Sequence, residues 1–143
     1  MNKLNPDSLF SIFEQGDQEI YKEHKIEELL ENPFTLLGTV VNGLENFHLL
    51  DKLYSFKYQD RYGEVRHKIQ HKYYGRMYTY LLKIDIGDMA SVIHEDTHLD
   101  VGRIIELLYD LLLHYQHIEQ YEKCGKIKKY TDLLLSKKLE DLL

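Results

Sequence analysis

Residues 94–98 have the sequence His-Glu-Asp-Thr-His, the one stretch of this chain whose residue types and spacing match a hydrolytic site. In zinc proteases the pattern His-Glu-x-x-His lies on a helix, where a spacing of four residues brings both imidazoles to one face. The glutamate then acts as general base towards the zinc-bound water. His94, Glu95 and His98 are therefore the candidate metal-binding residues, and the reaction would be a metal-dependent hydrolysis.

The residues around this motif favour a simpler interpretation. Thr97 followed by Asp100 is typical of a capped helix start, with the helix beginning at His98. A cap at Thr97 leaves His94 and Glu95 in extended backbone before the helix, where the two imidazoles do not converge. We therefore expect a helix start here, with no metal and no other cofactor, and the hydrolase is an alternative.

Glu45 to His48 and Glu95 to His98 both have the spacing Glu-x-x-His that ferritin-like di-iron proteins use, but that architecture needs four long helices and the middle of the chain favours strands. No further spacing in the sequence indicates catalysis. There is no glycine-rich phosphate loop and no Cys-x-x-Cys pair, and Cys124 is the single cysteine. A lone cysteine forms no internal disulfide, which fits a reducing compartment. His114 and His117 are three residues apart, a spacing that suits a metal or a pH switch, but we interpret them as half-exposed helix residues. The sequence thus predicts a protein that is not an enzyme.

The middle of the chain is basic and rich in tyrosine. Residues 52–83 carry eight basic and two acidic residues, whereas residues 1–51 carry three and ten, and residues 84–143 carry seven and twelve. Aromatic rings interleaved with cations are typical of proteins that bind single-stranded nucleic acid. The same cationic and aromatic side chains are equally suited to bind an acidic surface of another protein or the acidic helices of the same chain. The candidate partner-binding residues are Tyr54, Lys57, Tyr58, Arg61, Arg66, Lys68, Lys72 and Arg76.

The segments before residue 51 are predicted to be helical. Two short helices are expected within residues 5–31, each with a typical capping residue at its start. Residues 33–50 follow a similar signal at Asn32-Pro33, and their apolar residues keep helical spacing. A hairpin that turns at Asn42-Gly43 is the competing interpretation. We favour the helix.

Residues 53–93 change to a period of two. Apolar and polar residues alternate, and tyrosine, isoleucine and valine are frequent, which favours strands. We therefore expect a small antiparallel β-meander over these residues. From residue 98 the apolar residues return to helical spacing as far as Leu142, with a weak point at Gly125. This pattern predicts one long helix or two packed helices.

Together these elements predict a single α+β domain over residues 1–143, with N-terminal helices, the β-meander and long C-terminal helices packed on the sheet. No apolar run is long enough for a transmembrane helix or a signal peptide, so we expect a cytoplasmic protein. One alanine against twelve tyrosines indicates an AT-rich genome, bacterial or phage. For a phage protein the location would be the host cytoplasm or the virion.

The function that we expect is protein–protein interaction or assembly, as an accessory or structural subunit of a phage or a low-GC bacterium. The apolar face of the C-terminal helices would pack on the sheet or on a second copy. The expected partner is therefore another protein or a homo-oligomer, without a membrane. A single-stranded nucleic-acid-binding protein that uses residues 52–83 is the first alternative, and the metal-dependent hydrolase is the second.

Overall fold

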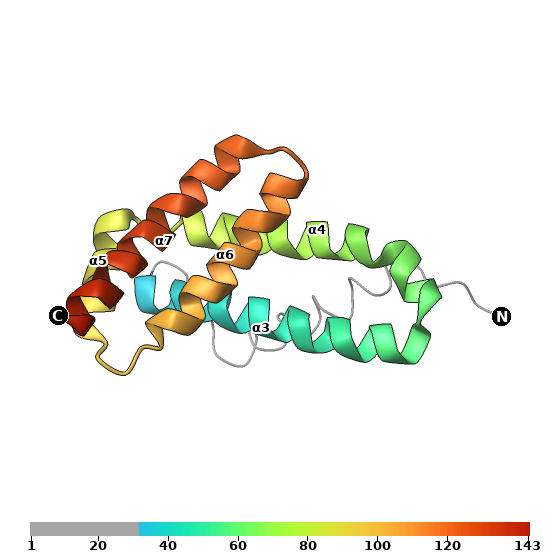
Figure 1. Ribbon diagram of the computed structural model, residues 1–143, viewed down its shortest axis with the longest axis horizontal. Helices are drawn as coiled ribbons and strands as arrows, with labels where there is room; N and C mark the ends of the chain where they lie inside the picture. The colour runs from blue at the N-terminus through green and yellow to red at the C-terminus, as the bar shows by residue number, and fades with distance from the viewer. Residues whose placement is uncertain (1–31) are drawn as a thin grey trace.

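The computed structural model describes residues 32–143, and this part of the chain is helical throughout apart from short turns (Figure 1). The two helices expected within residues 5–31 lie outside the described residues. In the described part, no helix is long and apolar enough to cross a membrane. The helices are α3 (Pro33–Tyr58), α4 (Asp60–Leu82), α5 (Ile86–Glu95), α6 (Val101–His117) and α7 (Tyr121–Leu142).

Two antiparallel helical pairs make up most of the described fold. α3 and α4 lie side by side as one long pair, and α6 and α7 form a shorter pair that crosses over one half of it (Figure 1). α5 links the two pairs and packs against α7 and α3. The end of the long pair where α3 joins α4 projects beyond α6 and α7 (Figure 1).

The helix predicted over residues 33–50 is confirmed, and the competing hairpin at Asn42-Gly43 is wrong. The Asn32 side chain accepts hydrogen bonds from the backbone N–H groups of Phe34 at 2.9 Å and Thr35 at 3.4 Å. These N–H groups have no intrahelical partner at a helix start, so the cap stabilises the first turn.

The predicted α+β fold is wrong, because residues 53–93 form no β-meander and instead complete α3 and make up α4 and most of α5. The buried residues of α4 show why a helix forms. They recur at spacings of three, four and seven residues and so line one face of a helix, whereas a strand buries every second residue. These residues are Tyr62, Ile69, Tyr73, Tyr74, Met77, Tyr78 and Leu81.

The C-terminal segment forms two packed helices, one of the two predicted arrangements, although they pack on helices and not on a sheet. The break between them falls at residues 118–120, not at Gly125, which lies within α7. Glu119 has a φ of 61°, in the left-handed region, where the chain reverses direction. The start of α6 also differs from the prediction. Asp100 and not Thr97 is its cap, and the Asp100 side chain accepts a hydrogen bond at 3.1 Å from the backbone N–H three residues later.

The crossing of α3 and α4 leaves no room for a side chain at Gly43. A Cβ there would overlap the Sδ of Met77 and lie 3.1 Å from its Cε. Met77 is fully buried, so its side chain has little freedom to move away. At Gly38, in the same helix, a Cβ would meet nothing within 4 Å. The two glycines therefore have different roles in α3.

We expect Gly43→Ala to lower the free energy of unfolding by about 1–3 kcal/mol, because it overpacks the α3–α4 contact. Gly38→Ala, the matched control, should raise the free energy of unfolding by about 0.5–1 kcal/mol, because alanine favours a helix more than glycine does. Denaturant-induced unfolding followed by circular dichroism measures both values. Equal effects of the two substitutions would contradict the close contact at Gly43.

Candidate functional site

A polar cluster lies where α3, α4 and α6 meet. Asp110 of α6 is its centre. His48 Nε2 from α3 is 3.0 Å from Asp110 Oδ2, and the Tyr74 hydroxyl from α4 donates a hydrogen bond to the same oxygen. The hydrogen bond from His48 is the main cause that holds the pKa of Asp110 below its usual value. Burial and the hydrogen bond to Asp110 raise the pKa of Tyr74, so the pair remains a carboxylate and a phenol.

A second carboxylate joins α3 to α4 farther along the long pair. Asp51 accepts hydrogen bonds from Arg66 Nε at 2.7 Å, from Arg66 Nη2 at 3.0 Å and from the Tyr62 hydroxyl at 2.7 Å. Arg66 Nη1 donates to Gln70 Oε1 at 3.2 Å. Two bonds between one guanidinium and one carboxylate fix the orientation of both groups. Arg66 therefore serves to join the two helices.

Three histidines gather between α4 and α6. The ring centre of His114 lies 5.4 Å from that of His71 and 6.2 Å from that of His67. His71 Nδ1 and His114 Nε2 are 3.2 Å apart, which allows one ring to donate a hydrogen bond to the other. Burial, followed by the charges of His71 and His67, lowers the pKa of His114 to about 4, so this ring is neutral at pH 7. The interpretation of His114 as half-exposed is wrong, since it is buried, whereas His117 is exposed.

A cleft of about 660 Å³ opens beside these groups, between α4 and α6. Its two charged groups are held by other side chains, Arg66 by Asp51 and Asp110 by His48. The cleft can therefore offer a ligand hydrogen bonds from imidazole and amide groups. No group of three His, Cys, Asp or Glu side chains within residues 32–143 is arranged to hold a metal ion. The cleft is lined by Arg66, His67, Gln70, Asp110, Leu113, His114, Gln116 and His117.

The His-Glu-x-x-His motif does not have the arrangement found in zinc proteases. His94 and Glu95 are the last residues of α5 and are helical, not extended as predicted. His98 follows in the loop before α6, where its backbone N–H donates a hydrogen bond at 3.0 Å to the Asp96 side chain. The three candidate ligands therefore do not share one helix face.

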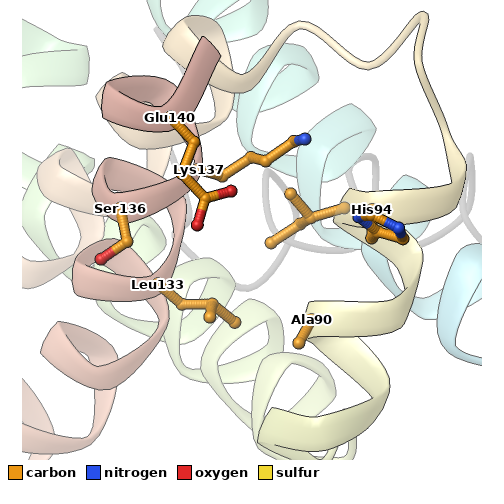
Figure 2. Close-up of a pocket in the computed structure, with 7 residues that line it drawn as sticks. Ala90, His94, Leu133, Ser136, Lys137 and Glu140 are labelled. Atoms are coloured by element: carbon orange, nitrogen blue, oxygen red, sulfur yellow. The ribbon is translucent and has the colours of Figure 1, made fainter. Parts of the chain in front are cut away.

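His94 lies instead at a groove between α5 and α7 (Figure 2). Figure 2 shows Ala90 and His94 on one helix facing Leu133 and Lys137 on the other. The groove combines apolar residues with single charges of each sign, a composition that is ordinary for a protein contact surface. It has a volume of about 390 Å³ and is lined by Ala90, Ile93, His94, Leu133, Ser136, Lys137 and Glu140.

The predicted partner-binding residues of α3 pack against one another. The Tyr54 and Tyr58 ring centres are 5.7 Å apart, and Lys57 Nζ lies 5.3 Å from the centre of the Tyr58 ring. Both tyrosines are half-buried. Four further tyrosines of the basic segment are buried, so their rings are not accessible to nucleic-acid bases: Tyr62, Tyr73, Tyr74 and Tyr78.

The five predicted partner-binding residues of α4 divide into two groups. Arg66 is directed towards Asp51 of α3. The other four recur at spacings of seven and four residues and so lie on one face of the helix. We call these four the basic stripe: Arg61, Lys68, Lys72 and Arg76. The structure thus brings half of the predicted residues together, on a helix and not on a sheet.

The sequence interpretation missed the polar cluster and the group of histidines. The spacing of four residues between His67 and His71 is a signal that was available, because on a helix it places both rings on one face. Apolar and polar residues alternate around Ile69 as they do in a strand, and this alternation obscures the four-residue spacing of the two histidines. Asp110 has no local signal, since Tyr74, which donates to it, lies 36 residues away in the sequence.

In the part that the structure describes, the fold and the site define a small all-helical protein with a histidine–aspartate–tyrosine cluster between two helical pairs. No protein-family model, no curated protein and no solved structure matches the chain.

We expect the free energy of unfolding to fall as the pH is lowered from 6.5 towards 4. A histidine in the unfolded chain binds a proton near pH 6.5, whereas folded His114 binds one only near pH 4. Acid therefore favours the unfolded state within this window, and the stabilisation by the neutral ring is complete only above it. Denaturant titrations at several pH values measure the slope.

His114→Gln should flatten this pH dependence, because glutamine does not titrate. His98→Gln is the matched control, since His98 is an exposed loop residue, and it should keep the slope of the wild-type protein. If His114→Gln also keeps the wild-type slope, the neutral state assigned to His114 is wrong.

Proposed function

We propose that the protein is a non-enzymatic assembly subunit that binds a second copy of itself through the outer face of α7. The observation that carries this proposal is a row of exposed leucines. Leu135, Leu139 and Leu142 have exposed fractions of 45%, 62% and 76%. Their spacing of four and three residues is the one by which paired helices interlock apolar side chains.

These leucines lie outside the core of the described residues. The buried side of α7 consists of Ile127, Tyr130, Thr131 and Leu134, and α7 packs on that side against α6, with α5 beside it. Contiguous exposed apolar side chains on a helix mark interaction sites more often than chance, whereas single ones do not. Three leucines on one face therefore support a contact surface.

The charges around the leucines favour a second copy as the occupant. A two-fold contact places a surface against itself, so a surface of one sign would repel its copy. The polar residues of α7 near the row carry both signs: Lys128 and Lys138 are positive, and Asp132 and Glu140 are negative. This mixture allows the face to pair with its own copy.

A second exposed apolar row lies on α3, but its charges are less suited to such pairing. Leu49, Leu53 and Phe56 are exposed, and the exposed cations Lys52 and Lys57 lie beside them. A two-fold contact between two α3 helices would bring these lysines close to one another, whereas Glu45, the acidic residue one turn before Leu49, is already paired with Arg103 of α6. The α3 row therefore provides a control surface for the α7 proposal.

The buried polar groups support a role without catalysis. Asp110 and Asp51 each accept hydrogen bonds from side chains of other helices, so they act as acceptors that join helices. His114 is buried and packs against Tyr74 with ring centres 5.1 Å apart. These contacts account for the polar cluster as a structural part of the fold. The exposed face of α7 is therefore the better candidate for the surface that binds a partner.

We expect the wild-type protein to sediment as a dimer at micromolar concentration and Leu139→Lys to sediment as a monomer, because a lysine would place a charge in the centre of the contact. Leu53→Lys makes the same change at a leucine of similar exposure, 54%, on α3 and should remain a dimer. Analytical ultracentrifugation measures all three. A monomeric wild-type protein, or a dimer lost only in Leu53→Lys, would overturn the proposal.

A further inference from the structure

A single residue, Gln59, joins α3 to α4, and its backbone is strained. α3 ends at Tyr58 and α4 begins at Asp60. Gln59 has a φ of 49° and a ψ of −124°, which lies outside the small left-handed region that residues with a side chain can enter. Glycine adopts such backbone angles without a steric cost, and many helices end at a glycine for this reason. Here the chain reverses at a glutamine, so the closed α3–α4 pair holds strain at its junction.

The residues around this junction favour a continuous helix once the strain is released. Lys57, Gln59 and Arg61 are good helix formers, and no proline or glycine lies between Ser55 and Arg61. The backbone N–H of Gln59 donates to the Ser55 carbonyl at 3.1 Å, and the Gln59 carbonyl accepts from the N–H of Gly63 at 3.1 Å. Both hydrogen bonds have the four-residue spacing of an α-helix. Rotation of the Gln59 backbone to helical angles would therefore join α3 and α4 into one helix of about 75 Å.

An α3 helix that swings away would leave contacts that another copy of α3 can restore. α3 packs against α4, α5 and α6 through its buried apolar face. A second copy of the chain offers the identical apolar face and the identical polar side chains, so an exchange of α3 between two copies keeps all of these contacts. The polar contacts that α3 makes with other helices include Asp51–Arg66, His48–Asp110 and Glu45–Arg103.

The arrangement of the helices leaves space for such an exchange. The joined ends of α3 and α4 project beyond α6 and α7 (Figure 1). Two opened chains can therefore lie antiparallel, with α3 of each along α4 of the other. The two groups of α5, α6 and α7 then lie at opposite ends of the long pair and do not collide.

We propose that Gln59 is a hinge at which the α3–α4 pair opens, so that two copies of this chain exchange α3. Short, strained hinges favour exchange, because the strain is released while the contacts are kept. Since α3 must leave the core, exchange takes place while the chains fold at high protein concentration, and not between native copies. The inference is independent of the proposed assembly through α7, which pairs two closed chains.

Reversal of the charges at the Asp51–Arg66 pair tests the proposal. Asp51→Arg places two guanidinium groups opposite each other within one closed chain, and Arg66→Asp places two carboxylates there. In an exchanged dimer of the two variants, each α3 faces an α4 of opposite charge at this position. Both variants also carry Leu139→Lys, which removes the proposed contact through α7. We expect the two variants, refolded together at high concentration, to form a one-to-one dimer that melts about 5 °C above either variant refolded alone.

Asp51→Arg/Arg66→Asp within one chain is the control, because it restores opposite charges in the closed chain and should recover the same stability without a second copy. The two single variants mixed as native proteins should remain monomers. A refolded mixture that contains only monomers would overturn the proposal. So would a one-to-one dimer that melts no higher than the single variants.

Glycine at the hinge provides a second test. In the Leu139→Lys background, Gln59→Gly should raise the concentration at which half of the refolded protein is dimeric by about a hundredfold. Relief of strain changes the equilibrium by about tenfold for each of the two hinges in the dimer. Glu119→Gly is the matched control, since Glu119 also has a positive φ but lies in the turn between α6 and α7, and it should leave this concentration unchanged. An equal effect of the two glycines would contradict a hinge at Gln59.

Discussion

A buried tyrosine ring brings a hydroxyl group that needs a hydrogen-bond partner inside the protein, and this requirement determines how the helices meet. Leaving such a group unpaired costs about 1–3 kcal/mol. Each hydrogen bond therefore fixes both the distance and the rotation of the two segments that it joins. Three buried tyrosines donate to a partner on another segment: Tyr62 to Asp51, Tyr74 to Asp110, and Tyr130 to the Ile84 carbonyl oxygen at 2.6 Å. Tyr115 differs from these three, since its buried hydroxyl has no hydrogen-bond partner within the described residues. Lys123 Nζ lies 4.9 Å from the centre of the Tyr115 ring.

The hydrogen bonds between the helices also engage carboxylate and imidazole groups, the side chains from which catalytic sites are usually built. A general base must be able to reach a substrate, but Asp110 and Asp51 already accept hydrogen bonds from tyrosine, histidine and arginine. The neutral ring of His114 packs between α4 and α6 and serves the contact of the two helical pairs. The basic stripe of α4 and the exposed leucines of α7 lie outside the core, on the surface of the described part of the chain. This division supports functions that depend on surfaces more than on a pocket.

The sequence allowed the ends of the described fold to be predicted better than its middle. At residues 33–50 the cap at Asn32 and the apolar spacing both favour a helix, and the C-terminal apolar spacing does so again. In residues 53–93 the abundance of tyrosine and isoleucine favours strands locally, but packing against α3 and α6 selects the helical spacing from Tyr62 to Leu81. The cations of the basic stripe were identified from composition, whereas their shared face follows only once α4 is known to be a helix. The cluster around Asp110 depends on contacts between distant segments, which single-sequence patterns do not contain.

The close contact of Gly43 with Met77 links the evolutionary histories of two positions that lie on different helices. A homologue with a larger residue at position 43 can keep the same helix separation if the residue at position 77 is smaller or turns its side chain away. A larger residue at position 43 alone would push α3 and α4 apart, and the Asp51–Arg66 hydrogen bonds, which join these two helices, would lengthen. Covariation between positions 43 and 77 would therefore identify relatives that share this helix crossing, even where little else in the sequence is recognisable.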